Sequence, residues 1–311
     1  MPVTLFKALA DETRIRLLRI LLDHELSVNE LLTILKMGQS RISRHLRILA
    51  EAGLVTSRRD GLWVFYQAHH KGENSAFIDA VTPFLQSCRQ AEEDRKETER
   101  ILLEKSSKTK QFFNSVADNW DNLNQEIIGD FDLAGAVRES RPEDCGLAVD
   151  LGCGTGVVLD RMLEGAKGVI GVDTSSRMLD ICRKRFGIGD GDSARVSLRI
   201  GDLEHLPLRD QEADFASINL VLHHLEKPEM ALAEARRILS PRGRLFITDF
   251  LRHNDESMRT QFGDRWLGFE ESRIAMGLRE AGFRRTRIRR QKIGRGLTLL
   301  IVVSYAEPPV L

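Results

Sequence analysis

The sequence predicts a mixed fold of two domains: a small α+β domain, followed by an α/β domain with an open, doubly wound sheet. Three observations predict this division. The 311 residues are too many for one small domain and suit two. Short helical patterns and an Asp-Gly turn occupy the first part of the chain. Beyond residue 111, apolar runs alternate with helical patterns, which indicates a mainly parallel sheet.

Bulk composition limits the class of protein. Hydrophobic residues make up 42% and charged residues 30%, as in ordinary globular domains. No stretch approaches the roughly 20 apolar residues of a membrane span, and the N-terminus lacks the pattern of a secretory signal. The cysteines form no CxxC pair, so we expect no disulfides and a cytoplasmic location. They are Cys88, Cys145, Cys153 and Cys182.

The first domain begins with helical patterns in a fixed order. Residues 4–22 are predicted as one helix. Ser27 and Glu30 have the spacing of a capping box, which predicts a short helix that ends at Gly38. A third helix is expected over residues 40–52, where Gly53 stops it.

The third helix and the segment after it predict a DNA-binding shape. Ile42, Leu46 and Leu49 share one face of the helix, which leaves the opposite face basic. Two strand-like runs, 55–59 and 62–68, flank an Asp-Gly turn and predict a hairpin. This order of elements is that of a winged helix-turn-helix, whose third helix enters the major groove.

Positive charge is concentrated on the third helix and the hairpin. Residues 39–59 contain five arginines and one acidic residue, which indicates an anionic partner, here double-stranded operator DNA. On charge alone, a solvated helix face with surplus arginine explains the cluster equally well. The N-terminal end of the helix is expected to contact base edges, and the remaining arginines phosphates. The predicted DNA-binding residues are Gln39, Ser40, Arg41, Ser43, Arg44, Arg47, Arg58 and Arg59.

Three segments of this domain, FKALADETRIRLLRIL, QSRISRHLRILAEAGLV and RRDGLWVFYQA, resemble the ArsR-type winged-helix repressors over roughly the first 70 residues. The resemblance implies a homodimer that pairs through the first and last helices, here residues 4–10 and 75–100. Metal-sensing members carry two cysteines where this sequence has Ser27 and Asn29. His69, His70 and Glu73 match no metal-site spacing, so we predict no metal site.

The chain then passes to its second domain. Phe77, Val81, Phe84 and Cys88 share one helical face, and the mostly charged residues 89–110 are expected to form an exposed helical linker. The sequence therefore predicts a DNA-binding and dimerisation domain over 1–88, a linker over 89–110 and a second domain over 111–311. Apolar runs of the second domain lie at 147–151, 168–172, 196–200, 214–221, 243–250 and 297–304.

A glycine-rich loop ends the first of these runs. Residues 149–156 read VDLGCGTG and lead into a helix, so the backbone can approach a ligand closely. The dinucleotide-binding pattern needs a third glycine where this sequence has Val157. Asp173 ends the second run and can accept hydrogen bonds from ribose hydroxyls. Asp202 follows the third run, Asn219 ends the fourth, and Asp249 ends the fifth.

Together these motifs resemble the class I S-adenosylmethionine methyltransferases, most closely the ubiquinone/menaquinone-biosynthesis branch, over about residues 111–305. The resemblance implies a Rossmann-like fold, S-adenosylmethionine as cofactor, and closure of residues 111–121 over it. Asp173 is expected to hold the ribose, and Asp202 with the Leu203 backbone the adenine. The implied cofactor residues are Asp150, Gly152, Gly154, Thr155, Gly156, Asp173, Thr174, Asp202, Leu203 and Asn219.

Methyl transfer asks little of the protein, because a sulfonium is a good leaving group and positioning supplies most of the acceleration. A general base is needed only if the nucleophile carries a proton. His223 and His224 are the candidates, although histidines that pack a loop or bind a backbone group fit the same pattern. Arsenite methylation would need several positioned cysteines, and the four here are scattered.

Three functions are compatible with these motifs. The first is a DNA-binding regulator with a working methyltransferase domain and a small-molecule acceptor, whose pocket we expect within residues 111–140 and 252–280. The second is a non-catalytic sensor of S-adenosylmethionine or S-adenosylhomocysteine that controls DNA binding. The third is an enzyme in which the winged helix serves only to form a dimer.

Overall fold

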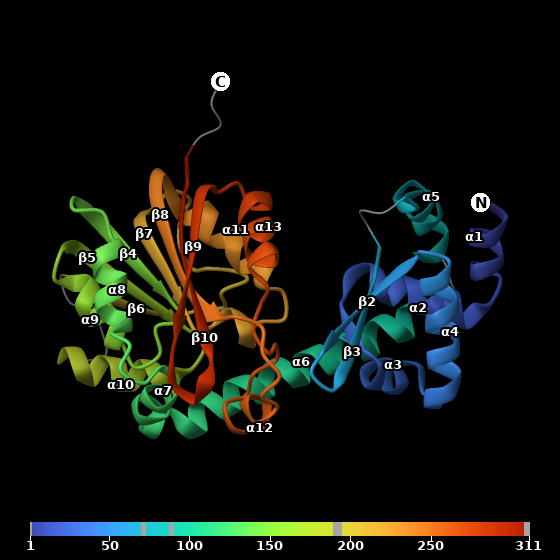
Figure 1. The fold of residues 1–311 in the computed structure, drawn as a ribbon, viewed down its shortest axis with the longest axis horizontal. Coiled ribbons are helices and arrows are strands. Elements are labelled where there is room, and N and C mark those ends of the chain that lie inside the picture. The colour runs from blue at the N-terminus through green and yellow to red at the C-terminus, as the bar shows by residue number, and fades with distance from the viewer. Residues whose placement is uncertain (1, 70–72, 87–89, 189–194, 308–311) are drawn as a thin grey trace. The chain divides into compact units, whose positions relative to one another are not determined.

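The computed structural model describes residues 2–69, 73–86, 90–188 and 195–307 and divides into two compact units, Met1–Lys108 and Thr109–Leu311 (Figure 1). Cys88 and His70 therefore lie outside the described residues. Within the described part, no helix combines the length and apolar character needed to cross a membrane. Each unit has its own hydrophobic core.

The first unit is a winged helix. An antiparallel sheet in the order β1-β3-β2 packs beside the helices. Its elements are α1 (Pro2–Leu9), α2 (Glu12–Asp23), β1 (Leu26–Ser27), α3 (Val28–Leu35), α4 (Gln39–Glu51), β2 (Val55–Asp60), β3 (Trp63–Ala68), α5 (Ser75–Gln86) and the first part of α6 (Ala91–Val116).

Helix boundaries in this unit follow local capping. The single helix predicted over 4–22 is wrong, because Asp11 is extended and caps α2 by accepting hydrogen bonds from the backbone nitrogens of Thr13 and Arg14. The capping box of Ser27 and Glu30 is confirmed at the start of α3.

Residues 91–105 do more than link. They belong to α6, which buries Asp94, Thr98 and Ile101. The Asp94 carboxylate lies 2.6 Å from a guanidinium nitrogen of Arg16 on α2, and Ile101 joins the winged-helix core. The expectation of an exposed helix fails on this face, because one side of the segment packs against the first unit.

The second unit is a seven-stranded sheet in the order β6-β5-β4-β7-β8-β10-β9, with β10 antiparallel to both neighbours. Its elements are α7 (Trp120–Ile128), α8 (Leu133–Ser140), β4 (Cys145–Leu151), α9 (Val157–Leu163), β5 (Ala166–Asp173), α10 (Ser176–Phe186), β6 (Val196–Ile200), β7 (Ala213–Asn219), α11 (Pro228–Ile238), β8 (Leu239–Phe250), α12 (Ser257–Gln261), α13 (Glu271–Glu280), β9 (Arg284–Lys292) and β10 (Thr298–Tyr305), with 3₁₀ turns Ala117–Asn119, Leu222–His224 and Gly294–Gly296.

Helices cover both faces of this sheet: α8, α9 and α10 pack on one face, and α11 and α13 on the other (Figure 1). The predicted fold class, a winged helix-turn-helix followed by a doubly wound Rossmann-like sheet, is confirmed. The carboxyl ends of β4, β5, β6, β7 and β8 meet at one edge, where such sheets bind ligands.

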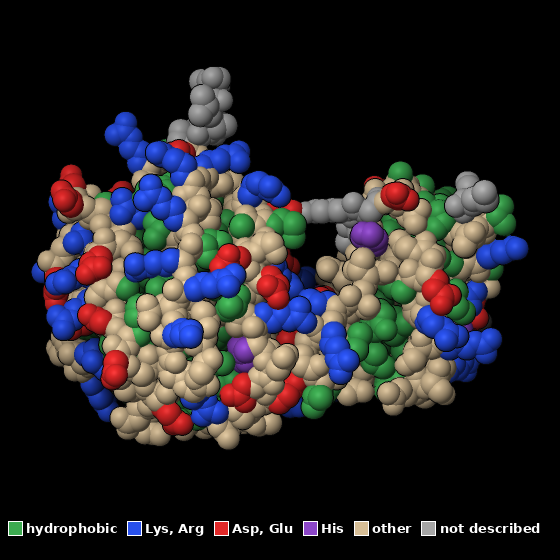
Figure 2. All heavy atoms as spheres, in the orientation of Figure 1, with side chains coloured by type: hydrophobic (Ala, Val, Ile, Leu, Met, Phe, Trp, Pro, Cys, Tyr) green, Lys and Arg blue, Asp and Glu red, His purple; other side chains and the backbone are tan. Residues whose placement is uncertain are grey.

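Strand β9 was not predicted from the sequence. Its nine residues, RRTRIRRQK, include six basic side chains and no acidic one. Only Thr286 and Ile288 are partly buried, because β9 is an edge strand with a single neighbour. Figure 2 shows Lys and Arg side chains gathered over this part of the sheet. Charged side chains are a common feature of exposed sheet edges.

Candidate functional site

The recognition helix α4 has one apolar and one polar face. Ile42, Leu46 and Leu49 are fully buried. The six residues of this helix that the sequence predicts as DNA contacts are all exposed: Gln39, Ser40, Arg41, Ser43, Arg44 and Arg47. The helix therefore presents a continuous polar surface that carries three arginines.

The two wing arginines differ. The Arg58 guanidinium lies 3.1 Å from Glu25 and 3.1 Å from Asp60, and it stacks 4.8 Å from the centre of the Phe65 ring. Arg59 is exposed and donates a hydrogen bond to the carbonyl of Gly61. Arg58 therefore holds the wing together, and Arg59 is the wing arginine that remains accessible.

The glycine loop after β4 is closely packed from behind. Gly152 and Gly156 have φ values of 81° and 84°, a region that side chains disfavour. A Cβ atom on Gly152 would lie 2.5 Å from Cγ2 of Val221, and one on Gly156 would lie 2.5 Å from the Cys182 sulfur. The loop backbone must therefore stay bare, which leaves room for a ligand to approach it.

Asp173, at the end of β5, fixes this loop. One carboxylate oxygen accepts a hydrogen bond from the Gly154 nitrogen at 2.9 Å, and the other accepts one from the Ser175 nitrogen at 2.8 Å. Burial raises the pKa of Asp173, and these hydrogen bonds oppose the increase. The neighbouring Thr174 is partly exposed. The carboxylate is thus held in place at the predicted ribose position.

Asp150 and Asn219 form a second support beneath the loop. Asp150 accepts hydrogen bonds from the Ser217 hydroxyl at 2.6 Å and from the Asn219 amide at 3.3 Å. Burial raises the pKa of Asp150 to about 6, against the effect of these hydrogen bonds. Asn219 also accepts a hydrogen bond from Thr248, so the ends of β4, β7 and β8 are joined.

Residues 111–121 contact this edge of the sheet at several points. Asn114 accepts a hydrogen bond from the Ser175 hydroxyl at 2.7 Å, and Asp118 lies 2.7 Å from Arg177. Asp121 accepts a hydrogen bond from Thr155, and Trp120 lies beside Gly154. The predicted closing segment is thus in contact with the glycine loop and the start of α10.

The residues predicted for the adenine lie at the same edge. Asp202 is exposed and accepts a hydrogen bond from the Glu204 nitrogen at 2.9 Å, whereas Leu203 is buried. The structure thereby brings the ten predicted cofactor residues to the ends of four neighbouring strands, β4 to β7.

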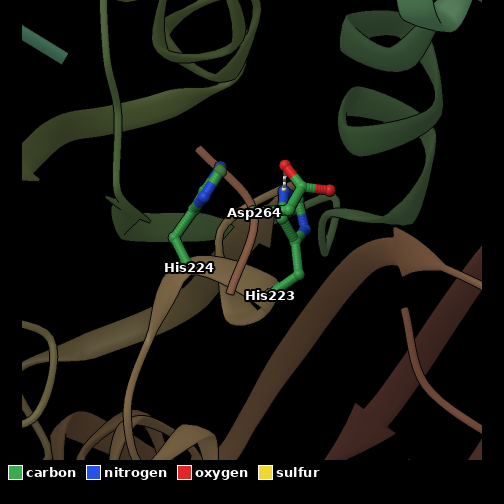
Figure 3. Close-up of side chains that lie close together, drawn as sticks. All are labelled: His223, His224 and Asp264. Atoms are coloured by element: carbon green, nitrogen blue, oxygen red, sulfur yellow. Dashed lines mark ion pairs between the residues drawn. The ribbon is translucent and has the colours of Figure 1, made fainter. Parts of the chain in front are cut away.

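His223 and His224 lie in a turn after β7 and line a cavity (Figure 3). Nδ1 of His223 lies 2.8 Å from an oxygen of Asp249, and its Nε2 lies 3.6 Å from an oxygen of Asp264. Nδ1 of His224 lies 3.2 Å from the Gly263 carbonyl oxygen. The remaining lining residues are Trp120, Asn124, Ile127, Leu220, Phe250, Met258 and Phe262.

The ionisable groups of this cavity are nearly all buried. Burial lowers the pKa of His223, but the carboxylates of Asp249 and Asp264 outweigh this effect and the pKa is raised. Burial lowers the pKa of His224 well below its usual value. Burial also raises the pKa of Asp264 to about 7, with a further increase from the Asp249 charge and opposing effects of His223 and Arg259. Sequence reasoning missed Asp264, because no local motif marks it.

Comparison with known families identifies both units. A family model described as "Bacterial regulatory protein, arsR family" matches residues 11–57, and one described as "Methyltransferase domain" matches residues 149–247. The chain joins an ArsR-family helix-turn-helix domain to a class I methyltransferase domain. The ArsR-family match includes helices α2 to α4, and the methyltransferase match includes the end of β4 and strands β5 to β7.

Three curated relatives each align with less than half of this chain. The ArsR-family domain is 49% identical over 81 residues to the arsenic resistance transcriptional regulator ArsR1 of Pseudomonas putida, covering 26% of this chain and 62% of the relative. The methyltransferase domain is 32% identical over 158 residues to the ubiquinone/menaquinone biosynthesis C-methyltransferase UbiE of Methylobacterium nodulans. This alignment covers 48% of this chain and 62% of the relative. An uncharacterised 37.1 kDa protein of transposon TN4556 from Streptomyces fradiae is 39% identical over 112 residues, which cover 35% of this chain and 31% of that protein.

In each case this chain spans less than two thirds of the relative's length. Among solved structures, the complex between the Haloferax volcanii Trm112 methyltransferase activator and a methyltransferase aligns with a TM-score of 0.53 at 19% identity, covering 64% of this chain and 97% of that one. The cyclase SpnF aligns with a TM-score of 0.53 at 19% identity, and the alignment covers 64% of this chain and 94% of that one. These similarities show the fold of the methyltransferase domain, and a fold alone does not fix a reaction.

Proposed function

We propose that this protein is a DNA-binding transcriptional regulator whose methyltransferase domain transfers a methyl group from S-adenosylmethionine to a small-molecule acceptor. The observation that carries the proposal is the cavity beside the glycine loop. Trp120 lies next to Gly154 and also lines the cavity that contains His223 and His224. A ligand on the loop would thus be a neighbour of the cavity, which has room for about one water as it stands (about 10 Å³) and would have to open to admit an acceptor.

The residues at the loop fit S-adenosylmethionine. Gly152, Gly154, Thr155 and Gly156 form a bare backbone segment at the start of α9 for the methionine part. We assign the ribose to Asp173 and Thr174 and the adenine to Asp202 and the Leu203 backbone. Asp150 and Asn219 hold the loop and place a negative charge beneath it. When bound, the cofactor supplies a methyl group on a sulfonium leaving group.

The chain's own residues would position the acceptor and exclude water. Phe250, Met258 and Phe262 give the cavity apolar walls, and residues 111–121 cover the loop. We assign His223 and His224 to the acceptor side of the cavity. Positioning of this kind can supply most of the acceleration, because the reacting atoms are brought into line.

We propose that the ArsR-family domain binds operator DNA as a homodimer. The arginines of α4 are exposed, and Arg59 supplements them from the wing. Large apolar side chains remain exposed on the expected pairing helices: Val3 and Phe6 on α1 are each 62% exposed, and Phe84 on α5 is 76% exposed. Exposed apolar patches of this kind are typical of interfaces. A protein that binds chromosomal DNA would act in the cytoplasm.

Calorimetry tests the ligand and the DNA together. We expect S-adenosylmethionine and S-adenosylhomocysteine to bind the full chain, and DNA from the gene's own upstream region to bind in a salt-dependent manner. A failure of either ligand class to bind would refute the corresponding half of the proposal.

Label transfer separates an enzyme from a sensor. The full chain is incubated with S-adenosylmethionine labelled in its methyl group and with a small-molecule extract of the source cells. We expect a labelled product that is absent without protein. If operator affinity responds to the ligand but no label is transferred, the chain is the non-catalytic sensor. The cavity with two histidines beside the glycine loop favours the enzyme over this alternative.

A further inference from the structure

Three side chains of the cavity have the composition of a metal site. His223, His224 and Asp264 each offer one ligand atom, and these atoms lie within 4.8 Å of one another. All three residues are buried, and they come from two segments, the turn Leu222–His224 and the loop after α12 (Figure 3). Two imidazoles and a carboxylate are a common ligand set for zinc and for non-haem iron.

Each histidine is already held by its other ring nitrogen. Nδ1 of His223 lies 2.8 Å from Asp249, and Nδ1 of His224 lies 3.2 Å from the Gly263 carbonyl oxygen. Because both partners are hydrogen-bond acceptors, each Nδ1 carries the proton when the ring is neutral, and the lone pair is then on Nε2. Metal-binding histidines in proteins are oriented by carboxylates and carbonyls in this way.

Asp264 lacks the hydrogen bonds that a buried carboxylate needs. It is 5% exposed, it lines the cavity, and neither of its oxygens accepts a hydrogen bond from the part of the chain that the structure describes. Nε2 of His223 lies 3.6 Å from one of these oxygens, beyond hydrogen-bond distance. A buried carboxylate without hydrogen-bond donors is unfavourable, and a proton or a bound cation would relieve this cost.

We propose that His223, His224 and Asp264 bind one divalent transition-metal ion, with Asp249 orienting His223 from behind. A divalent cation would balance the two carboxylates, Asp249 and Asp264, once both histidines are neutral. Bonds of about 2.0–2.2 Å to the metal require the three ligand atoms to move closer together than 4.8 Å. Side-chain rotation about the existing hydrogen bonds can provide this contraction.

A zinc ion held by these three residues would have a fourth coordination position left, and the cavity that the three residues line would give access to it. This position would take an oxygen of the methyl acceptor, which places the acceptor in the class of small molecules with a hydroxyl or carboxylate group. This assignment of the acceptor rests on the proposed methyltransferase function. Binding of the metal does not depend on it, because the ligand set belongs to the folded chain alone.

Metal titration of the full chain tests the site. The protein is stripped with a chelator and dialysed, and Zn²⁺ is then titrated by calorimetry, with the bound metal counted by mass spectrometry. We expect one high-affinity ion per chain and a rise in melting temperature. Replacement by Co²⁺ should give the visible absorption bands of a histidine and carboxylate site.

Variants locate the ion. His223→Ala, His224→Ala and Asp264→Asn should each weaken Zn²⁺ binding on the order of 100-fold, and Asp249→Asn by about 10- to 100-fold. His205→Ala, at an exposed histidine, is the matched control and should leave binding unchanged. Retained binding of S-adenosylhomocysteine shows that each variant is folded. Zn²⁺ binding that is absent in the wild type, or equal in all variants, overturns the proposal.

Two outcomes separate this proposal from the proposed function. A site that binds Zn²⁺ through these residues in a protein that never transfers a methyl group supports the metal site and refutes the enzyme. Label transfer that proceeds equally after removal of the metal, with no Zn²⁺ bound on titration, supports the enzyme and refutes the metal site.

Discussion

The glycine loop and the histidine cavity lie at the same sheet edge but differ in how their polar atoms are satisfied. At the loop, both oxygens of Asp173 accept backbone hydrogen bonds, and Asp150 accepts two from side chains. In the cavity, Asp264 is buried with two oxygens that accept none within the described chain. The carboxylates at the loop thus have hydrogen-bond donors from the protein, whereas the Asp264 carboxylate in the cavity has none within the described chain.

This difference indicates two kinds of binding site. A ligand at the loop adds contacts to a rigid scaffold, so the loop's geometry decides affinity. A ligand in the cavity would also relieve an unfavourable burial, so its charge decides affinity. Variants that change shape should therefore act mainly at the loop, and variants that change charge should act mainly in the cavity.

The largest effect is expected from shape at the loop. Gly152→Ala places a Cβ atom 2.5 Å from the branched side chain of Val221, and we expect affinity for S-adenosylhomocysteine to fall on the order of 100-fold. Gly187→Ala is the matched control, because Gly187 also has positive φ but nothing lies within 4 Å of its Cβ position. Calorimetry that gives equal affinities for both variants would contradict a close-packed loop.

The second test removes charge from the loop without changing its shape. Asp173→Asn cannot accept both backbone hydrogen bonds, because its amide nitrogen would face a backbone N–H. We expect affinity for S-adenosylmethionine to fall by about 10- to 100-fold. Asp180→Asn, at an exposed position of α10, is the control and should have no effect. An unchanged affinity in Asp173→Asn would remove the predicted ribose contact.

Two arginines of the ArsR-family domain differ in a similar way: one is held by acidic side chains of the protein, and the other is exposed on the recognition helix. Arg44 is exposed on α4, and Arg44→Ala should weaken operator binding by about fivefold to tenfold and reduce its salt dependence. Arg58 is held by Glu25 and Asp60, so Arg58→Ala should mainly lower stability, by about 1 kcal/mol. Fluorescence anisotropy and thermal unfolding check the pair, and the reverse order of effects would contradict the assignment.

The smallest effect is a pH dependence at the loop. The pKa of Asp150 is raised to about 6, so this carboxylate is charged above that pH and neutral below it. A sulfonium cation favours the charged form, and its affinity should be constant near neutral pH and weaken as the pH falls through about 6. Between about pH 7.5 and 5.5 we expect a loss of roughly twofold to fourfold. Asp150→Asn should flatten the profile, and a wild-type profile that is already flat would exclude this role.

The features that could be predicted from the sequence are those that depend on a short contiguous segment. The glycine loop is one contiguous segment, and Asp173 directly ends an apolar run, so both can be placed from the sequence alone. The capping box of Ser27 and Glu30 and the apolar face of α4 are likewise encoded within one or two turns. Features of this kind depend on local spacing alone.

The features that were missed depend on contacts between distant residues. Asp264 meets His223 only because the loop after α12 returns to the end of β7, so no local spacing marked this pair of side chains. Arg58 stays a predicted DNA contact, but its pairing with Glu25, which precedes β1, depends on the assembly of the β1-β3-β2 sheet and not on local spacing. Strand β9 lacks the apolar alternation by which a strand is predicted from sequence. It forms through its pairing with β10, which local sequence does not reveal.

The charge on β9 has a consequence for self-association. Two copies of this strand placed edge to edge would bring arginine against arginine along their length, and like charges opposite each other destabilise such pairing. Sheet extension between molecules is therefore disfavoured at this boundary, although its backbone groups are free to form a ladder. The proposed homodimer would pair through the helices of the ArsR-family domain instead, and concentrated solutions of the protein should resist the formation of fibres through β9.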